Sequence, residues 1–461
     1  MFSQTTNLEG SHSITHDKSN EEELRKGYTV GDRFMSLGHE VSSITSKNLV
    51  ESLSEEVRST LTRTYRPTKK QKLAIAAVLA DLLRLASYEG EAYGYRPRGR
   101  DDFAGHRIAY SPCINCLDAF AASGYVHHRP GVWLGTRRTG QGSTSAYKAT
   151  TTLLERCLAH GITPANWRLH FALAPRSATV PHPIIVRAKR RYWDDDRKGK
   201  KLPVNKRHPA YIAAARQVQG INGYMAKQDI TGCKLDGFVR IFNHGDDAHF
   251  AYDMGGRLYG NASGCSYQNM AKSDRVNFRI NGEPIVEVDL RGSFITIFYA
   301  LQSAYLDPTE DPYTFGSLPR DVAKVWINMT FGHAGFHKEW PKAVVTKFAT
   351  SGIDLQTSFP IASVRAQVMK EHPILTRWPS STFRWQHLQN MEATAVISAV
   401  EALAFEHDVP ALPLHDALLI PVSKVAVARQ VLTRTFSDVV GVEPVITVKD
   451  KWDKPKALKA A

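Results

Sequence analysis

The segment INGEPIVEVDLRGSFITIFYALQ, residues 280–302, contains the change of local structure that decides the fold. Its Asn-Gly pair is a strong turn signal, and the β-branched residues that follow favour a strand. Side chains alternate along a strand, so Glu287 and Asp289 share one face. The chain then becomes helical. The segment therefore predicts an aspartate at the end of a strand, where a carboxylate can hold a divalent cation against bound phosphates.

A second segment, LPRDVAKVWINMTFGHAG at residues 318–335, carries two cations on a predicted helix. Arg320 and Lys324 are four positions apart and therefore share one helix face. Two aligned cations suit a triphosphate, because they neutralise charge that develops on a leaving pyrophosphate. Phe331 follows as an aromatic that could stack on an incoming base. Taken alone, the two cations are explained more simply by an exposed helix face.

A third segment, VPALPLHDALLIPVSKVAVARQVLTRTF at residues 409–436, has two short apolar runs that flank His415-Asp416. This pattern predicts a hairpin with the His-Asp pair at its tip, followed by an amphipathic helix. A polar pair between two buried strands is unfavourable unless it is paired or binds a metal. Taken alone, a structural role is the simpler interpretation, and the position of the pair after the other two segments favours metal binding.

The three segments in this order resemble the palm and fingers motifs of family A DNA polymerases and of the related phage-type single-subunit RNA polymerases. The family's first motif is an aspartate at a strand end, which matches Asp289 in VEVDLRGSF. Its second is R-x-x-x-K leading to an aromatic-glycine pair, and its third is the His-Asp hairpin. The predicted helix HLQNMEATAVISAVEAL, with Gln389 and Glu392, occupies the place of the family's Gln-bearing helix. The resemblance covers about 200 residues.

The resemblance implies an α+β fold, in which a polymerase-like palm with an antiparallel sheet and helical fingers follows a mostly helical, winged-helix-like domain. It also implies two-metal phosphoryl transfer with two Mg²⁺ ions, or Mn²⁺ in their place. Asp289 and Asp416 would bind the metals, and Lys324 would act on the pyrophosphate. Arg320 would grip a phosphate and His415 would contact the primer end.

This sequence departs from the family at three positions. DNA polymerases of the family carry a glutamate where Phe294 stands, and an aromatic there resembles the sugar gate of reverse transcriptases. Ala417 replaces the acidic residue that commonly follows His-Asp, and Phe331 falls one residue before the family's tyrosine. The choice between ribose and deoxyribose stays open. The predicted nucleotide-binding residues are Arg320, Phe294 and Phe331.

The first third of the chain lies outside this resemblance. Between residues 50 and 180, a helix closed by Gly124, a strand after it, a basic Gly-rich hairpin and YKAT before a helix resemble a winged helix-turn-helix domain. Arg137, Arg138 and Lys148 would then form a wing that touches phosphates. A small structural domain with charges facing water is an equally good interpretation. Residues 1–20 are polar and without periodicity, so we expect disorder.

A basic run at residues 187–207 contains ten Lys or Arg residues with two aromatics among them. Basic and aromatic side chains together suit phosphate contact and base stacking, although charge runs are often solvated surface. The formal net charge of +14 favours a polyanionic partner. We predict a basic linker at residues 181–215, before a polymerase-like domain at residues 216–461. The predicted nucleic-acid contacts are Arg137, Arg138, Arg190, Arg191, Arg257, Tyr259 and Gln389. Arg257 and Tyr259 could equally be polar residues at the rim of a sheet.

Composition argues against two classes of protein, disulfide-stabilised proteins and membrane proteins. Five cysteines in 461 residues argue against a disulfide framework and fit a cytoplasmic location. No apolar run approaches the roughly 20 residues of a spanning helix, so we expect no membrane partner.

These observations predict a template-directed nucleotidyltransferase of a plasmid, phage or mobile element. Its partners would be a DNA or RNA template-primer and nucleoside triphosphates, and its oligomeric state stays open. The first alternative is a non-catalytic DNA-binding replication initiator or regulator with a degenerate palm. A metal-dependent nuclease is the second, although it has no use for the Arg320 and Lys324 helix.

Overall fold

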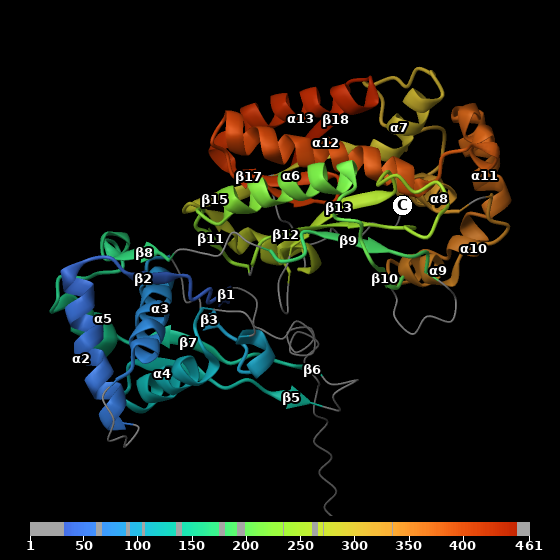
Figure 1. Ribbon diagram of the computed structural model, residues 1–461. Coiled ribbons are helices and arrows are strands. Elements are labelled where there is room, and N and C mark those ends of the chain that lie inside the picture. Colours follow the sequence, from blue (N-terminus) through green and yellow to red (C-terminus); the bar gives the residue numbers. More distant parts are fainter. Residues whose placement is uncertain are drawn as a thin grey trace, which may run out of the picture. The chain divides into compact units, whose positions relative to one another are not determined.

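The computed structural model describes residues 32–60, 67–88, 93–103, 107–134, 141–174, 180–190, 199–233, 235–260, 266–270, 272–333 and 335–449. The chain divides into two compact units, residues 1–174 and 175–461, and each is described by itself (Figure 1). The disorder expected for residues 1–20 concerns a segment outside the described residues.

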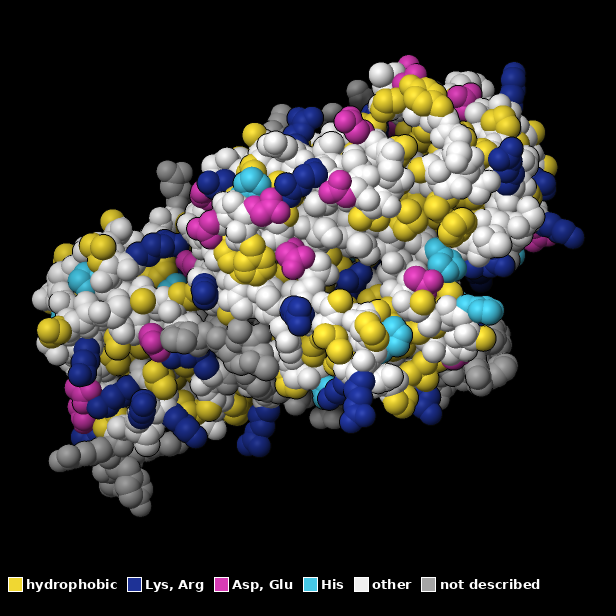
Figure 2. Space-filling view, turned by 45° about the horizontal axis from the view of Figure 1, so that its top comes forward, with side chains coloured by type: hydrophobic (Ala, Val, Ile, Leu, Met, Phe, Trp, Pro, Cys, Tyr) yellow, Lys and Arg dark blue, Asp and Glu magenta, His cyan; other side chains and the backbone are white. Residues whose placement is uncertain are grey.

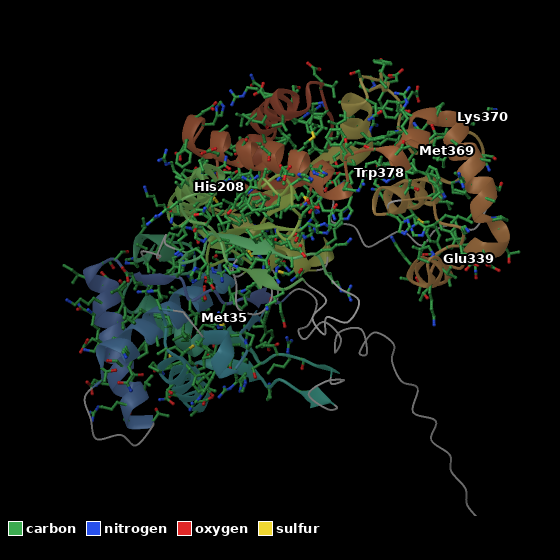
Figure 3. All side chains as sticks on the ribbon, turned by 45° about the vertical axis from the view of Figure 1, so that its right-hand side comes forward. Met35, His208, Glu339, Met369, Lys370 and Trp378 are labelled. Carbon is green, nitrogen blue, oxygen red and sulfur yellow. The ribbon has the colours of Figure 1, made fainter. Side chains whose placement is uncertain are left out.

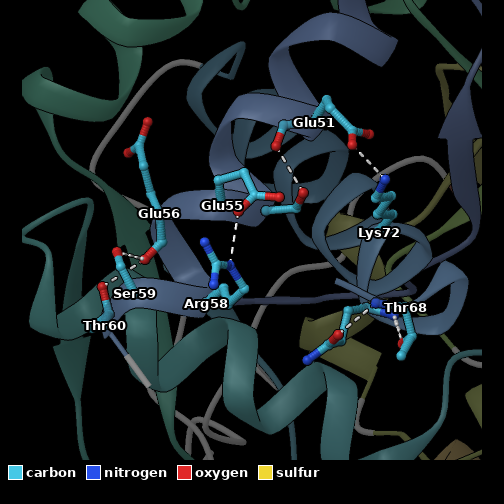
Figure 4. A network of polar contacts seen from close by, with 10 residues as sticks. Glu51, Glu55, Glu56, Arg58, Ser59, Thr60, Thr68 and Lys72 are labelled. Carbon is cyan, nitrogen blue, oxygen red and sulfur yellow. Dashed lines mark hydrogen bonds and ion pairs between the residues drawn. The ribbon is translucent and has the colours of Figure 1, made fainter. Parts of the chain in front are cut away.

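The first unit is built around a buried helix. Its helices are α2 (Ile44–Thr60), α3 (Lys69–Ala86), α4 (Tyr110–Ala122) and α5 (Thr151–Leu158), with 3-10 turns η1 (Arg100–Phe103) and η2 (Trp167–Leu169). Helix α3 is buried on all sides from Ala74 to Leu85, so it forms the centre of this unit's core. Thr68 caps its N-terminus, and the Lys72 ammonium lies 2.5 Å from the Glu51 carboxylate on α2 (Figure 4). The exposed polar contacts thus join α2 to α3 at their rim.

Short strands complete the first unit. One sheet has the order β1-β3-β7-β4, and its strands are β1 (Arg33–Phe34), β3 (Gly94–Tyr95), β7 (Ala146–Ala149) and β4 (Val126–Arg129). Two further pairs are β2 (His39–Val41) with β8 (Phe171–Leu173), and β5 (Trp133–Leu134) with β6 (Gln141–Gly142). The predicted succession of helix, strand, hairpin, strand and helix is therefore present from α4 to α5.

The second unit begins with a four-stranded sheet in the order β10-β9-β12-β13, packed on helix α6 (Pro209–Met225). Its strands are β10 (Lys201–Leu202), β9 (Ile184–Arg187), β12 (Phe238–Phe242) and β13 (Gly255–Gly260). Residues 181–215 were predicted to form a linker. Where the structure describes them they do not, because Ile184 and Val186 of β9 are buried in the core of this unit. The basic run that follows concealed these two apolar positions in the sequence.

A second sheet carries residues 280–291, which include the strand with Asp289. Its antiparallel order is β11-β14-β15-β17-β16, with β18 paired to the far part of β15. The strands are β11 (Ile230–Thr231), β14 (Arg279–Ile280), β15 (Glu283–Arg291), β16 (Leu412–Leu414), β17 (Ala417–Pro421) and β18 (Val445–Lys449). Helices α7 (Ser293–Leu301), α12 (Trp385–Glu406) and α13 (Val425–Val440) pack with it, and α12 and α13 run along each other (Figure 1).

The remaining helices form a separate cluster of the second unit. They are α8 (Arg320–Phe331), α9 (Lys342–Ala349), α10 (Leu355–Ser358) and α11 (Ile361–Glu371), with η5 (Pro373–Ser380). Further 3-10 turns are η3 (Tyr267–Asn269), η4 (Lys272–Asn277) and η6 (Val422–Lys424). In Figure 3, Trp378 lies inward of Lys370, which agrees with its burial in the core. Antiparallel sheet and segregated helices together agree with the predicted α+β class.

Two surface properties bear on partners. On the face shown in Figure 2, Lys and Arg side chains are spread among acidic and apolar side chains, so charge does not single out an interface there. Among the described residues, no helix has both the length and the apolar character needed to cross a bilayer.

Candidate functional site

Asp289 and Asp416 lie on neighbouring strands. Strand β17 runs antiparallel to β15, with Asp289 opposite Ala417, and the amide of Leu290 donates to the carbonyl oxygen of Asp416 at 3.0 Å. The register therefore brings both aspartates to the same end of the sheet. Their role as metal ligands stays a prediction.

The His-Asp pair occupies the two-residue loop of a hairpin, as predicted. Leu414 pairs with Ala417, so His415 and Asp416 alone connect β16 to β17. His415 has a φ of 58°, the positive value that a tight two-residue hairpin turn requires. All five residues of β17 are buried, and their burial fixes the register that presents the loop.

The carboxyl group of Asp416 lies in a crowded acidic environment. Burial raises its pKa to about 7, and repulsion from Glu392 and Asp289 contributes in the same direction, while Arg257 opposes the shift. The carboxylates of Glu392 and Asp289 therefore lie close enough to that of Asp416 to repel it. Only Asp289 and Asp416 belong to the predicted metal pair.

Glu392 on α12 is a buried acidic residue beside the two aspartates, and the sequence contains only a weak signal for it. It is 1% exposed and accepts hydrogen bonds from the Ser293 hydroxyl and from Nε of Arg257, the latter at 3.1 Å. Nη1 of Arg257 also lies 3.5 Å from Nδ1 of His415. Glu392 thus ties strand β13, the start of α7 and the His-Asp turn together. In the sequence, the only indication of this role is that Glu392 is the one charged residue in the stretch MEATAVISAV, residues 391–400.

Asp289 has cationic and hydroxyl neighbours on β18. The Lys449 ammonium contacts Oδ2 of Asp289 and lies 2.8 Å from Oε1 of Glu287. The Thr447 hydroxyl lies 3.4 Å from Oδ2 of Asp289. Glu287 and Asp289 therefore lie on one face of β15, as predicted, and Lys449 bridges their carboxylates.

Tyr313 connects the predicted cation pair to the carboxylates. It is 3% exposed, and its ring centroid lies 5.5 Å from the Arg320 guanidinium carbon and 5.7 Å from the Lys324 ammonium. Burial raises the pKa of the Tyr313 hydroxyl, and the negative charge of Asp416 raises it further. Tyr313 therefore lies within electrostatic reach of Asp416 and beneath both cations. The sequence showed it only within DPYTF, which we interpret most simply as a turn.

The structure corrects the prediction for Phe331. Its side chain is 1% exposed and packs against Phe298 and Trp378, with ring centroids 5.6 Å and 5.0 Å away. A ring enclosed in the core cannot stack on an incoming base, so that predicted role is wrong. Phe294 is half-buried and packs against the same core.

The predicted nucleic-acid contacts differ in exposure, and those on β13 and α12 lie on two elements that pack together. Gln389 is buried, Tyr259 is half-buried on β13, and Arg190 is exposed. Arg257 is largely buried and paired with Glu392, so direct contact with a nucleic acid is not its main interaction here. Arg137, Arg138 and Arg191 lie outside the described residues.

The side chains that could bind a divalent cation at this site are few. No group of three or more His, Cys, Asp or Glu side chains among the described residues gathers into a metal-binding cluster. Mg²⁺ is commonly held by one or two protein carboxylates together with substrate phosphates and waters. Asp289 and Asp416 fit that requirement, and a cation would favour the charged form of Asp416, which burial and the repulsion from Glu392 and Asp289 disfavour.

No protein-family model matches the sequence, and no curated protein matches it. A solved structure, the POL domain of Pol1 from M. smegmatis in complex with DNA primer-template and dNTP, matches at 11% identity and a TM-score of 0.29. The match covers 94% of this chain and 69% of the other. A TM-score this low does not establish a shared fold, and the site is supported by its own geometry.

Proposed function

We propose that this protein is a template-directed nucleotidyltransferase with its active site at Asp289 and Asp416. The observation that supports this most is the β15–β17 register, which places the two aspartates at one sheet end. The Tyr313 ring lies 5.5 Å from Arg320 and 5.7 Å from Lys324, and its hydroxyl lies close to the Gly292 turn that follows Asp289, which supports a role for these cations in the same site. Two acidic and two basic side chains that converge in this way suit a metal-bound triphosphate.

Each residue has a chemical task in this proposal. Bound divalent cations would lower the pKa of a primer hydroxyl and stabilise the leaving group. Asp289 and Asp416 hold those cations, and Arg320 grips a phosphate. Lys324 supplies charge, and a proton, to the departing pyrophosphate. His415 contacts the primer end from the hairpin tip, where Arg257 lies beside it.

The first unit supplies a second contact with nucleic acid in this proposal. Its sheet order β3-β7-β4, with helix α4 before β4 and the β5–β6 pair between β4 and β7, fits a winged helix whose wing carries Arg137 and Arg138. A second DNA contact of this kind suits a polymerase of a plasmid, phage or mobile element.

Primer extension tests the proposal directly. Purified protein is supplied with primer-template, Mg²⁺ or Mn²⁺, and dNTPs or NTPs in separate reactions. Asp289→Asn and Asp416→Asn should lose incorporation at least a thousandfold while binding primer-template as the wild type does. Asp438→Asn on the exposed side of α13 is the matched control and should be fully active. Extension by either active-site variant at the wild-type rate would overturn the assignment.

A non-catalytic DNA-binding initiator or regulator is the second candidate. It is favoured by the Lys449 ammonium on Asp289 and by Ala417 in place of a third acidic residue at the hairpin. Intact DNA binding without incorporation of any nucleotide, under either metal, would select it. Metal-dependent nicking without nucleotide would instead select a nuclease.

A further inference from the structure

A loop between α7 and α8, residues 307–318, is fastened to both halves of the candidate site. Nη2 of Arg291, the last residue of β15, donates to the carbonyls of Pro308 and Glu310 at 3.1 Å and 3.2 Å. The next residue, Asp311, accepts from Nε of Arg320 at 2.9 Å. The loop therefore spans from the Asp289 strand to the helix that carries the cation pair.

The centre of the loop packs directly on the turn that follows Asp289. Gly292 has a φ of +66°, and a Cβ there would lie 3.1 Å from Cγ of Pro312 and 3.7 Å from the Tyr313 hydroxyl. A larger residue at this turn would be strained and would push Pro312 away. The contact places Tyr313 between the turn and the two cations above its ring.

A buried histidine from a different part of the chain holds this loop in place. His372, which follows α11, is 3% exposed, and its Nε2 lies 2.7 Å from the carbonyl oxygen of Pro312. A carbonyl can only accept, so Nε2 carries the hydrogen. Nδ1 then accepts from the Tyr299 hydroxyl of α7, 2.8 Å away. Both ring nitrogens are thus satisfied by a single neutral tautomer.

We propose that His372 is a positioning residue for the nucleotide site, which pins Pro312 and so holds Tyr313 beneath Arg320 and Lys324. The proposal rests on the proposed function, because it assigns nucleotide binding to these cations. His372 touches neither cation in the described contacts and acts only through the loop. Its edge-on packing against the ring of Phe315, with centroids 5.5 Å apart, fixes the plane in which Nε2 points at Pro312.

Substitutions separate positioning from general stability. His372→Phe removes the donor to Pro312 and should raise the KM for nucleotide about tenfold, with a smaller change in kcat. His372→Gln keeps an amide donor and should recover much of the loss. Trp340→Phe is the matched control, because Trp340 also donates from a buried ring to a carbonyl, that of Phe359 at 2.8 Å, away from the loop.

Three measurements decide the proposal. Steady-state incorporation gives the KM and kcat of each variant, and a fluorescent nucleoside triphosphate with Mg²⁺ gives equilibrium affinity without turnover. Hydrogen exchange reports on the amides of residues 307–318. We expect His372→Phe to weaken the analogue and to increase exchange in this loop, while primer-template affinity stays at the wild-type value. Trp340→Phe should do neither.

The outcomes are distinguishable from those of the proposed function. If the wild type binds the nucleotide analogue but incorporates no nucleotide, the proposed function is wrong. The affinities of wild type and His372→Phe for the analogue then still decide the role of His372. Equal affinity of wild type and His372→Phe for the analogue overturns the positioning role. Absence of binding by both overturns it as well. A loss in Trp340→Phe as large as that in His372→Phe would show that general stability explains the effect.

Discussion

The amide of Leu290 donates to the carbonyl oxygen of Asp416 at 3.0 Å, so the backbone itself ties the His-Asp hairpin tip to the strand that carries Asp289. The positions of the two aspartates therefore depend on the sheet and not on their own carboxylates. Variants that change only the carboxylates should keep the fold, which makes their loss of function interpretable.

Replacing Asp416 by Asn should stabilise the protein at alkaline pH. Burial, with repulsion from Glu392 and Asp289, raises the pKa of Asp416 from 3.8 to about 7. The folded state thus holds this proton more tightly, and the free energy of unfolding falls as pH rises from about 4 to about 7. Above pH 7 the whole penalty is present, so Asp416→Asn should gain roughly 1 to 3 kcal/mol there. Urea denaturation at pH 5.5 and 8 measures it; an equal effect at both pH values contradicts the prediction.

The Mg²⁺ requirement should depend on pH through the same carboxyl group. A cation must displace the Asp416 proton, so the half-saturating Mg²⁺ concentration should rise about tenfold per pH unit below 7. Glu392→Gln removes a neighbouring negative charge and should move this rise to lower pH. Mg²⁺ titrations of incorporation between pH 6 and 8 test it. Identical profiles for wild type and Glu392→Gln would exclude coupling between Glu392 and Asp416.

The Arg257–Glu392 pair should show strong coupling in a double-mutant cycle. Glu392 is 1% exposed and Arg257 18%, so removing either partner leaves the other charge poorly solvated. Glu392→Ala should lower the free energy of unfolding by about 3 kcal/mol, and the double variant with Arg257→Ala should lose much less than the sum. The exposed Arg58–Glu55 pair on α2 is the control, with an expected coupling below about 1 kcal/mol. Additive losses at Arg257 and Glu392 would disprove the pairing.

Phe331 should behave as a core residue and not as a base-stacking platform. Phe331→Leu keeps an apolar side chain among Phe298 and Trp378, and should cost about 1 to 2 kcal/mol of stability. The KM for nucleotide should stay within about twofold of the wild type. Thermal denaturation and steady-state incorporation measure the two effects. A large rise in KM with unchanged stability would restore the stacking role.

The proposed wing should contribute through phosphates and therefore through salt dependence. Arg137→Ala with Arg138→Ala should reduce the slope of log affinity against log salt by about 2 for duplex DNA. Incorporation on a primer-template held at saturating concentration should be unchanged. Fluorescence anisotropy at several NaCl concentrations measures the slope. An unchanged slope would show that the hairpin charges face water.

Local signals in the sequence identified several elements correctly. Alternation and β-branching predicted strand β15 with Asp289 near its end, and the two apolar runs around His415-Asp416 predicted the hairpin. These features depend on neighbours within a few residues, which is why the sequence alone reveals them. The same local view failed at residues 184–187, where the basic run that follows concealed a buried strand.

What the sequence determined by itself is the identity and order of the acidic and basic side chains and the local elements that carry them. Only the tertiary structure decided which side chains meet: Glu392 with Arg257, Lys449 with Asp289, Tyr313 with the cation pair, and Phe331 with the core. Contacts of this kind join residues more than a hundred positions apart, as Glu392 and Arg257 are, or depend on how a loop packs. They follow from packing and strand register across the whole unit, which no local pattern encodes.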